Sequence, residues 1–220
     1  MPINEKYTAV FDSEKIYHIY NRTNNKELLF RSDENYYYFL RRYSHFISPI
    51  AETYAWNLLP NHFHFIIKIK PVSEILSWLA TLPLDTITTT EKHFLADQDV
   101  NWLVEMTFKR LFTSYAMAYN KMYQRSGNLF YRTFKRVEIL KEADFTHAIV
   151  YVHANAQKHQ LVKEFISYPW TSFHSIISDK PTNLLRAEII DWFGSKAQFI
   201  KVHKEMSAYY YGAAGGIEDD

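Results

Sequence analysis

Cysteine is absent from the chain, and glycine, proline and long apolar runs are scarce. Without cysteine the 220-residue protein has no disulfide, no thiolate metal ligand and no thiol nucleophile. Only 5 glycines and 7 prolines occur, which excludes collagen-like and low-complexity classes. No apolar run is long enough to span a membrane, and the first residues lack the basic and apolar pattern of a signal peptide. We therefore expect a cytoplasmic protein that does not bind membranes.

Hydrophobic side chains are abundant, at 47% of the residues, and 17% of the residues are aromatic. This composition is typical of a globular protein with a sizeable core. A chain of this length is long for one average domain and short for two. We expect one compact domain over residues 1–180, followed by a helical extension and tail over residues 181–220.

Hydrophobic periodicity predicts an alternation of strands and helices. Strands are expected at residues 15–21, 53–59, 62–69 and 129–140. Helices are expected at residues 35–47, 73–82, 100–124, 142–158, 184–193 and 196–209, with a threonine-rich loop over residues 83–99. The order β-α-β-β-α-β before the helix at 142–158 indicates an α+β fold of the ferredoxin-like class, a sheet with helices on one face.

Two histidines lie in the strand predicted at residues 62–69, in the stretch L-L-P-N-H-F-H-F-I-I-K-I-K-P. Side chains of a strand alternate between faces, so His62 and His64 share one face with Lys68, and Phe63 and Phe65 share the other. The phenylalanine face is expected to pack on a core and the histidine face to meet polar groups. Two imidazoles can share a metal ion, although ligation requires further groups, and two satisfied structural histidines give the same pattern.

A second group of polar residues lies on the helix predicted at residues 142–158. Residues four apart stand one above the other on a helix, so His147, Tyr151 and Asn155 form a single stripe, continued by Lys158 or His159. A solvated face usually carries lysine and glutamate, whereas this stripe carries a phenol, an amide and imidazoles. The stripe is therefore a candidate site, with a half-buried structural face as the alternative.

Basic residues are concentrated in one part of the chain. Residues 109–141 carry a net charge of +7, and the remainder carries −6. Aromatic residues are interleaved with this basic segment. Such a mixture suits contact with phosphates and stacking on nucleic-acid bases, and an amphipathic helix with a solvated basic side is the alternative interpretation.

Five stretches, in this order, carry a family resemblance. They are Y-H-I-Y-N-R-T-N-N (residues 17–25), L-P-N-H-F-H-F-I-I, R-S-G-N-L-F-Y-R-T-F-K (residues 125–135), Y-V-H-A-N-A-Q-K-H-Q-L-V and Y-P-W-T-S-F (residues 168–173). Together they resemble the REP-associated tyrosine transposases, which belong to the histidine-hydrophobic-histidine (HUH) single-tyrosine superfamily and move as single-stranded DNA. The resemblance covers about residues 17–178.

The resemblance implies a metal-dependent transposase that cleaves and rejoins single-stranded DNA at REP-like palindromic hairpins. Tyr151 would be the nucleophile and form a 5′-phosphotyrosine, and His62, His64 and Asn155 would hold Mg²⁺ or Mn²⁺. Two neutral imidazoles and a neutral amide leave the ion its full charge for polarising a phosphate, although they do not select one metal.

Basic and amide residues around the predicted site are expected to contact DNA. They are Asn21, Arg22, Arg125, Arg132, Lys135, Arg136 and Lys158. His18 and His153 occur in matching stretches of the family and are interpreted as packing or hydrogen-bonding histidines. The chain is expected to act as a monomer or homodimer, on the nucleoid of a bacterium. Two alternatives remain, namely a nuclease-dead protein that binds hairpin DNA and a small-molecule His-x-His metalloenzyme with a third imidazole.

Overall fold

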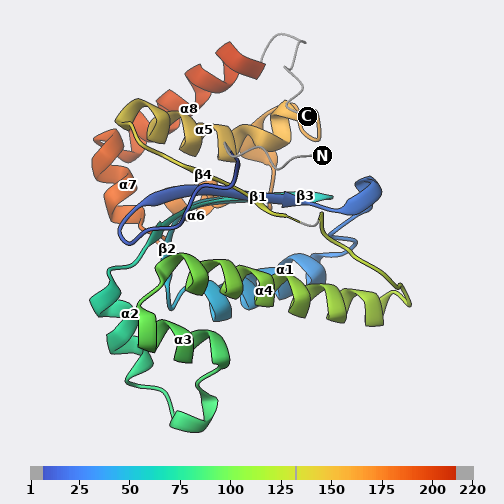
Figure 1. Ribbon diagram of the computed structural model, residues 1–220. Helices are drawn as coiled ribbons and strands as arrows, with labels where there is room; N and C mark the ends of the chain where they lie inside the picture. The colour runs from blue at the N-terminus through green and yellow to red at the C-terminus, as the bar shows by residue number, and fades with distance from the viewer. Residues whose placement is uncertain (1–6, 132, 212–220) are drawn as a thin grey trace.

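A four-stranded sheet with helical layers on both faces forms the centre of the molecule (Figure 1). The computed structural model describes residues 7–131 and 133–211. The strands are β1 (Ile16–Arg22), β2 (Ala51–Leu59), β3 (His62–Ile69) and β4 (Lys135–Glu138). The helices are α1 (Asp33–Ile47), α2 (Val72–Leu79), α3 (Thr89–Asp97), α4 (Val100–Met122), α5 (Glu142–Lys158), α6 (Phe173–Ile177), α7 (Arg186–Phe193) and α8 (Lys196–Tyr211). Short 3₁₀ turns occupy Asn24–Lys26, Leu84–Thr86 and Phe165–Ser167.

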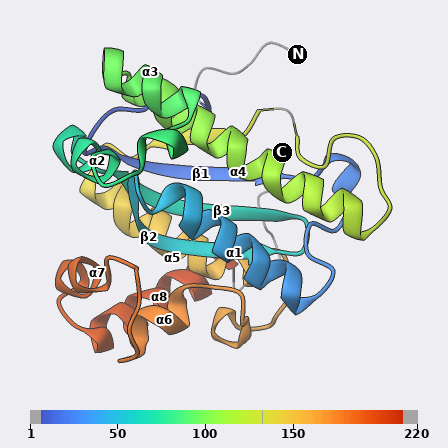
Figure 2. The same cartoon turned by 90° about the horizontal axis from the view of Figure 1, so that it is seen from below.

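The strands lie in the order β2-β3-β1-β4, and every neighbouring pair is antiparallel. With α1 between β1 and β2, and α4 before β4, this order confirms the predicted α+β class and its β-α-β-β-α-β arrangement. Figure 2 shows α1 and α4 side by side against one face of the sheet, with α5 on the far face. The two faces therefore carry different layers of the molecule.

The face toward α1 and α4 is an aromatic core. Phe63 and Phe65 of β3 are fully buried, as predicted from their alternation, and Phe65 stacks on Tyr43 of α1 with ring centroids 4.0 Å apart. The ring centroids of Phe39 of α1 and Phe63 are 5.2 Å apart. This packing ties the strand that carries the two histidines to the helix layer beneath it.

The opposite face packs under α5 and the C-terminal helices. Ala55 and Ile66 of the sheet share a buried cluster with Ile149 of α5, Phe193 of α7 and Phe199 of α8. The polar surroundings expected for the histidine face of β3 do not extend along the whole strand, because Ile66, on the same face, belongs to this second core. Residues after 181 supply part of the layer that covers α5.

Two predicted elements differ from the structure. The segment expected as a threonine-rich loop contains helix α3, which begins with a capping box in which Thr88 and Glu91 bond each other's backbone. The strand expected over residues 129–140 is shortened to β4, and only a single bridge, between Thr23 and Phe130, precedes it. Within the described residues no helix is both long enough and apolar enough to cross a bilayer.

Candidate active site

The two histidines lie at the start of β3, directly after the turn formed by Pro60 and Asn61. In the sheet register His64 stands opposite Tyr20 of β1 on one side and Asn57 of β2 on the other. His64 is only 4% exposed, whereas His62 at the end of the strand is partly exposed. The sheet thus fixes both imidazoles on the face toward α5, one deep and one near the surface.

Each imidazole makes one hydrogen bond through its Nδ1 atom. Nδ1 of His62 lies 2.7 Å from Oδ1 of Asn61. Nδ1 of His64 lies 2.9 Å from Nε2 of His18, a residue of β1. The ring centroids of His62 and His64 are 5.2 Å apart, and their planes are nearly perpendicular. The interpretation of His18 as a hydrogen-bonding histidine is confirmed by its contact with His64.

Burial keeps these imidazoles neutral. It lowers the pKa of His18 to about 4 and the pKa of His64 well below its ordinary value. It also lowers the pKa of His62 to about 4, helped by the neighbouring charge of His159 and opposed in part by the nearby Asn155 amide. At neutral pH each ring therefore has one nitrogen lone pair, which is the form that ligates metals.

Helix α5 brings Tyr151 and Asn155 to this pair, as their spacing predicts. The ring of Tyr151 stands edge-on to His18 and His64, with centroid separations of 5.8 and 5.7 Å. Asn155, one turn later, is 0% exposed, and among the described residues neither atom of its amide makes a hydrogen bond of normal geometry. A buried amide without a partner costs free energy, so this side chain fits a site that supplies a ligand.

Lys158 lies beside the Tyr151 hydroxyl. Its Nζ atom is 3.5 Å from the phenol oxygen and 4.9 Å from the centre of the ring. The ammonium therefore places a positive charge next to the oxygen that would carry negative charge in a nucleophilic attack. His147, at the other end of the predicted stripe, is exposed.

Buried polar contacts hold α5 against the sheet. Nδ2 of Asn57 donates to the backbone carbonyl of Val152 at 2.7 Å. On the next residue, Nε2 of His153 lies 2.8 Å from Oγ of Ser172, and Nδ1 of His153 lies 2.8 Å from Nε2 of His203 on α8. The prediction that His153 faces away from Tyr151 as a hydrogen-bonding histidine is confirmed. Sequence reasoning missed Asn57 and His203, because only the sheet register and the packing of α8 bring them to α5.

Three residues expected to contact DNA make side-chain contacts within the protein. Arg136 is buried and its guanidinium bonds Glu105 of α4 at 3.0 Å, so it faces the aromatic core and not the site. Arg125 forms a double hydrogen bond with Glu27, each contact 2.7 Å long. Asn21 is buried, and its amide donates to a backbone carbonyl of the segment before β4. Asn21 and Arg136 are therefore largely removed from solvent and Arg125 is partly exposed, and DNA contact by these residues stays a prediction.

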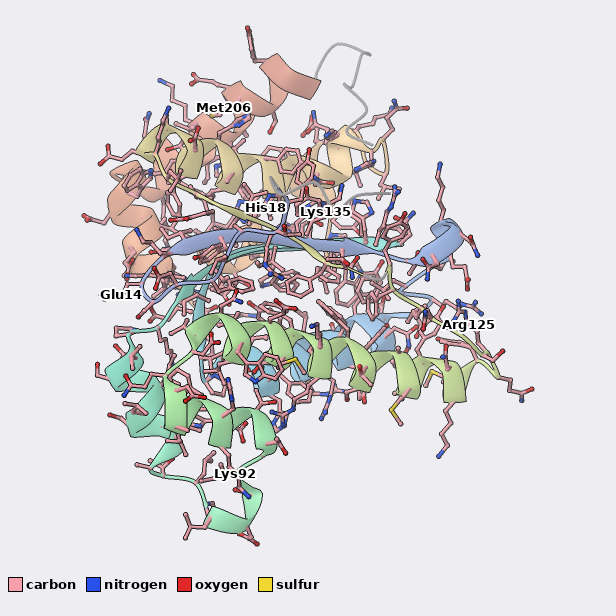
Figure 3. All side chains as sticks on the ribbon, in the orientation of Figure 1. Glu14, His18, Lys92, Arg125, Lys135 and Met206 are labelled. Carbon is pink, nitrogen blue, oxygen red and sulfur yellow. The ribbon has the colours of Figure 1, made fainter. Side chains whose placement is uncertain are left out.

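Two other cationic residues flank the histidine pair. Arg22 is exposed at the end of β1, opposite His62 in the register. Lys135 of β4 lies opposite Tyr20, with its Nζ atom 5.6 Å from the centre of that ring. Figure 3 shows Lys135 and His18 together on the α5 side of the sheet, whereas Arg125 lies beyond the end of α4. Arg132 lies outside the described residues.

The basic segment does not form a continuous surface for stacked bases. Among its described aromatic residues Tyr131 is 51% exposed and Tyr123 is partly buried, and the others are core residues. The buried ones are Phe112, Tyr115, Tyr119, Phe130 and Phe134. Lys109 and Arg110 are paired with glutamates. Burial therefore contradicts the stacking interpretation for most of these rings, and cations near the site come from β1, β4 and α5.

The residues present fit a weakly held divalent ion. Among the described residues no group of three or more histidine, aspartate or glutamate side chains could hold a metal. A site here would consist of His62, His64 and the Asn155 amide, and the unpartnered amide oxygen matches the preference of Mg²⁺ and Mn²⁺ for oxygen ligands.

Comparison with known proteins places the fold. No family model matches the sequence, and no curated protein matches it. The structure is similar to that of a REP-associated tyrosine transposase bound to a REP hairpin, with a TM-score of 0.55 and 16% sequence identity. The match covers 80% of this chain and 88% of that one. The two chains share a fold, and the structural relationship expected from the sequence resemblance is confirmed.

Proposed function

We propose that this protein is a metal-dependent tyrosine transposase that cleaves single-stranded DNA beside a hairpin and joins it to a new end. One observation carries the proposal. The phenol of Tyr151 stands over the His18 and His64 rings, one helical turn from a fully buried amide that makes no normal hydrogen bond. The fold shared with a hairpin-bound tyrosine transposase supports a related activity.

His62, His64 and Asn155 would hold the ion, which is Mg²⁺ or Mn²⁺ in this proposal. When bound, such an ion polarises the phosphate and neutralises charge that develops on its oxygens. Because all three ligands are neutral, the ion keeps its full charge for this purpose. The same neutrality makes the site weak, so the substrate phosphate would complete the shell.

The covalent step uses Tyr151 as the nucleophile. Its hydroxyl oxygen attacks the phosphorus, the bond from phosphorus to the 3′ oxygen breaks, and the tyrosine proton is transferred so that a 3′-hydroxyl leaves. The products are a 5′-phosphotyrosine and a free 3′ end. Attack by another 3′-hydroxyl reverses the step and joins strands without ATP. Lys158, 3.5 Å from the phenol oxygen, stabilises the charge that the attack creates.

Single-stranded DNA is the substrate that suits this site. Arg22, Lys135 and Lys158 surround the histidine pair on the α5 side of the sheet and can contact successive phosphates. A hairpin would hold the neighbouring duplex outside the site and leave an unpaired strand to enter it. The protein would act as a monomer or homodimer.

A nuclease-dead hairpin-binding protein is the second candidate, because the shared fold alone does not require chemistry. A small-molecule metalloenzyme is disfavoured. It requires a third strong ligand, from His147 or another histidine, and no group of three or more histidine, aspartate or glutamate side chains among the described residues could hold a metal.

The test is incubation of the protein with Mn²⁺ and hairpin oligonucleotides copied from the DNA that flanks the gene. A protein-linked band on a denaturing gel that carries a 3′-end label but no 5′-end label supports the proposal, because the downstream product is the one joined to tyrosine. Tight hairpin binding without a covalent band, at saturating Mn²⁺ and over all flanking sequences, supports the nuclease-dead alternative.

A further inference from the structure

The Nδ1 atoms of both histidines are occupied by neighbouring side chains, which bears on how the rings can act. A neutral imidazole has one N–H and one lone pair, and the partner of one nitrogen decides which nitrogen keeps the lone pair. If Nδ1 carries the proton, Nε2 is free to ligate. If Nε2 carries the proton, the ring cannot ligate through Nε2, and its Nδ1 is already bonded.

For His62 the partner is an amide oxygen, which can only accept. Oδ1 of Asn61, 2.7 Å from Nδ1, therefore requires the proton on Nδ1 and leaves the Nε2 lone pair free. Asn61 lies in the turn between β2 and β3, so a residue of this turn also sets the orientation of the His62 ring.

For His64 the partner is another imidazole. His18 can accept a proton at Nε2 from Nδ1 of His64, or donate one in the opposite direction. Only the first arrangement leaves Nε2 of His64 as a ligand. His18 is held by the strand register and by stacking on Tyr20, with centroids 4.8 Å apart, so its ring is fixed in reach of His64.

We propose that Asn61 and His18 are positioning residues that hold His62 and His64 with the proton on Nδ1, so that both Nε2 lone pairs are presented to one ion. The separation of the two ring centroids, 5.2 Å, is compatible with two imidazoles that share an ion at ~2.1 Å from each nitrogen. The inference rests on the proposed function, because the ion serves the proposed reaction. Its tests need neither DNA nor activity.

The first experiment uses metal-free, DNA-free protein with ¹⁵N-labelled histidine at neutral pH. Long-range ¹H–¹⁵N correlation spectra report which ring nitrogen carries the proton. The His62→Ala and His64→Ala variants assign the two rings by loss of their signals. We expect both rings to be protonated at Nδ1. A proton on Nε2 of His62 overturns the role of Asn61, and a proton on Nε2 of His64 overturns the role of His18.

The second experiment measures binding of Mn²⁺ alone by the loss of the free-ion signal in electron paramagnetic resonance. Variants Asn61→Ala and His18→Phe remove the acceptor and should weaken Mn²⁺ binding by about 10- to 100-fold. Asn61→Asp and His18→Gln keep an acceptor oxygen and should recover most of the affinity, which a loss of packing alone would not allow. The control is His45→Phe, because His45 is an exposed residue of α1.

The outcomes separate this inference from the proposed function. Unchanged affinity in folded Asn61→Ala and His18→Phe overturns the positioning role. If His18→Phe fails to fold, the Asn61 pair of variants and the His18→Gln spectra still decide. Rings protonated at Nδ1 in a protein that forms no DNA adduct contradict the proposed function and leave the positioning role standing.

Discussion

At the scale of single residues, the site divides the work between groups that differ in burial. His64 and Asn155 are buried, whereas Tyr151, His62 and Lys158 are partly buried. A buried amide and imidazole have fixed positions, which suits ligands, whereas a nucleophile must be reached by substrate. Each residue can therefore be removed with a different expected effect.

Tyr151→Phe should abolish the covalent adduct and leave DNA binding nearly unchanged. The substitution removes one oxygen and keeps the ring that stands on His18 and His64. Binding is measured by fluorescence anisotropy on a labelled hairpin and adduct formation on a denaturing gel. Tyr37→Phe on α1, where the side chain is 56% exposed, is the matched control and should behave as the unmodified protein. An adduct that persists in Tyr151→Phe would place the nucleophile elsewhere.

Asn155→Ala should lose rate in a different way. It removes one proposed ligand but not the nucleophile, so a higher concentration of Mn²⁺ should restore part of the rate of adduct formation. The measurement is the dependence of that rate on Mn²⁺ concentration, compared with Tyr151→Phe, in which no concentration restores it. A rate in Asn155→Ala that saturates at the same Mn²⁺ concentration as the unmodified protein would show that the amide is not a ligand.

At the scale of elements, β3 serves two layers at once. Its phenylalanines are fully buried against α1 and α4, and its histidines lie under α5. A change on one side of the strand should affect stability, and a change on the other should affect chemistry.

Phe63→Ala should lower the free energy of unfolding by about 3 to 5 kcal/mol, because a fully buried ring is replaced by a cavity. His62→Ala, one residue earlier on the partly exposed end of the same strand, should unfold at nearly the same urea concentration as the unmodified protein. Met117→Ala, with a side chain 69% exposed on α4, is the control for substitution in the aromatic layer and should change stability by less than about 0.5 kcal/mol. Equal losses in Phe63→Ala and Met117→Ala would contradict the packing described.

Helix α5 is tied to α8 by a chain of hydrogen bonds whose direction is determined. Nδ1 of His203 donates to the carbonyl of Phe199 at 2.8 Å, so its Nε2 accepts from Nδ1 of His153. Nε2 of His153 then accepts from the hydroxyl of Ser172, whose oxygen accepts the backbone N–H of Trp56 at 2.8 Å. Every group is satisfied only while both imidazoles are neutral.

This chain predicts loss of stability in acid. Burial lowers the pKa of His203 to about 4 and that of His153 well below its usual value, whereas both are near 6.5 in the unfolded chain. The unfolded state therefore binds more protons, and stability falls as the pH drops below about 6.5 toward 4. The free energy of unfolding, measured with urea between pH 4 and 6.5, should fall with decreasing pH more steeply in the unmodified protein than in His203→Gln. The difference between the two slopes should be about 1.4 kcal/mol per pH unit. Parallel slopes would contradict the chain of bonds described.

At the scale of the whole molecule, α5, which carries the proposed nucleophile, packs on the histidine strand of the same chain. Helix α5 contacts both β2 and β3. The site that we propose is therefore complete within a single copy.

A mixture of two inactive variants tests this arrangement. Tyr151→Phe lacks the nucleophile and His62→Ala lacks a ligand, and neither chain can supply the missing group to the other when each site is built within one copy. We expect no recovery of adduct formation in the mixture, measured against the same total amount of unmodified protein. Recovery to a substantial fraction of that activity would mean that α5 of one copy completes the sheet of another.

The sequence predicted the elements of the site better than their surroundings. The bounds of β3 and α5 follow from local patterns, namely alternation after a Pro-Asn turn and a regular polar stripe on a helix. Helix α3 was missed because threonines lower helix propensity, although its capping box, Thr88 to Glu91, was present in the sequence.

Roles that depend on distant partners could not be read locally. Lys135 and Arg136 are neighbours with the same charge, and only the register with β1 places the first toward α5 and the second against Glu105. The contacts of His18, Asn57 and His203 likewise join residues 46 or more positions apart along the chain.

The tie between α5 and α8 also bears on the protein as it leaves the ribosome. All side chains of the proposed site have been made once residue 158 has been added, but His203 and the apolar face of α8 have not. Since chains emerge from the amino end, a nascent chain holds the reactive groups before it holds the helix that α5 packs against. The contacts of α5 with β2 and β3 involve segments already made at that point, whereas its contacts with α8 can form only after residue 203 has been added.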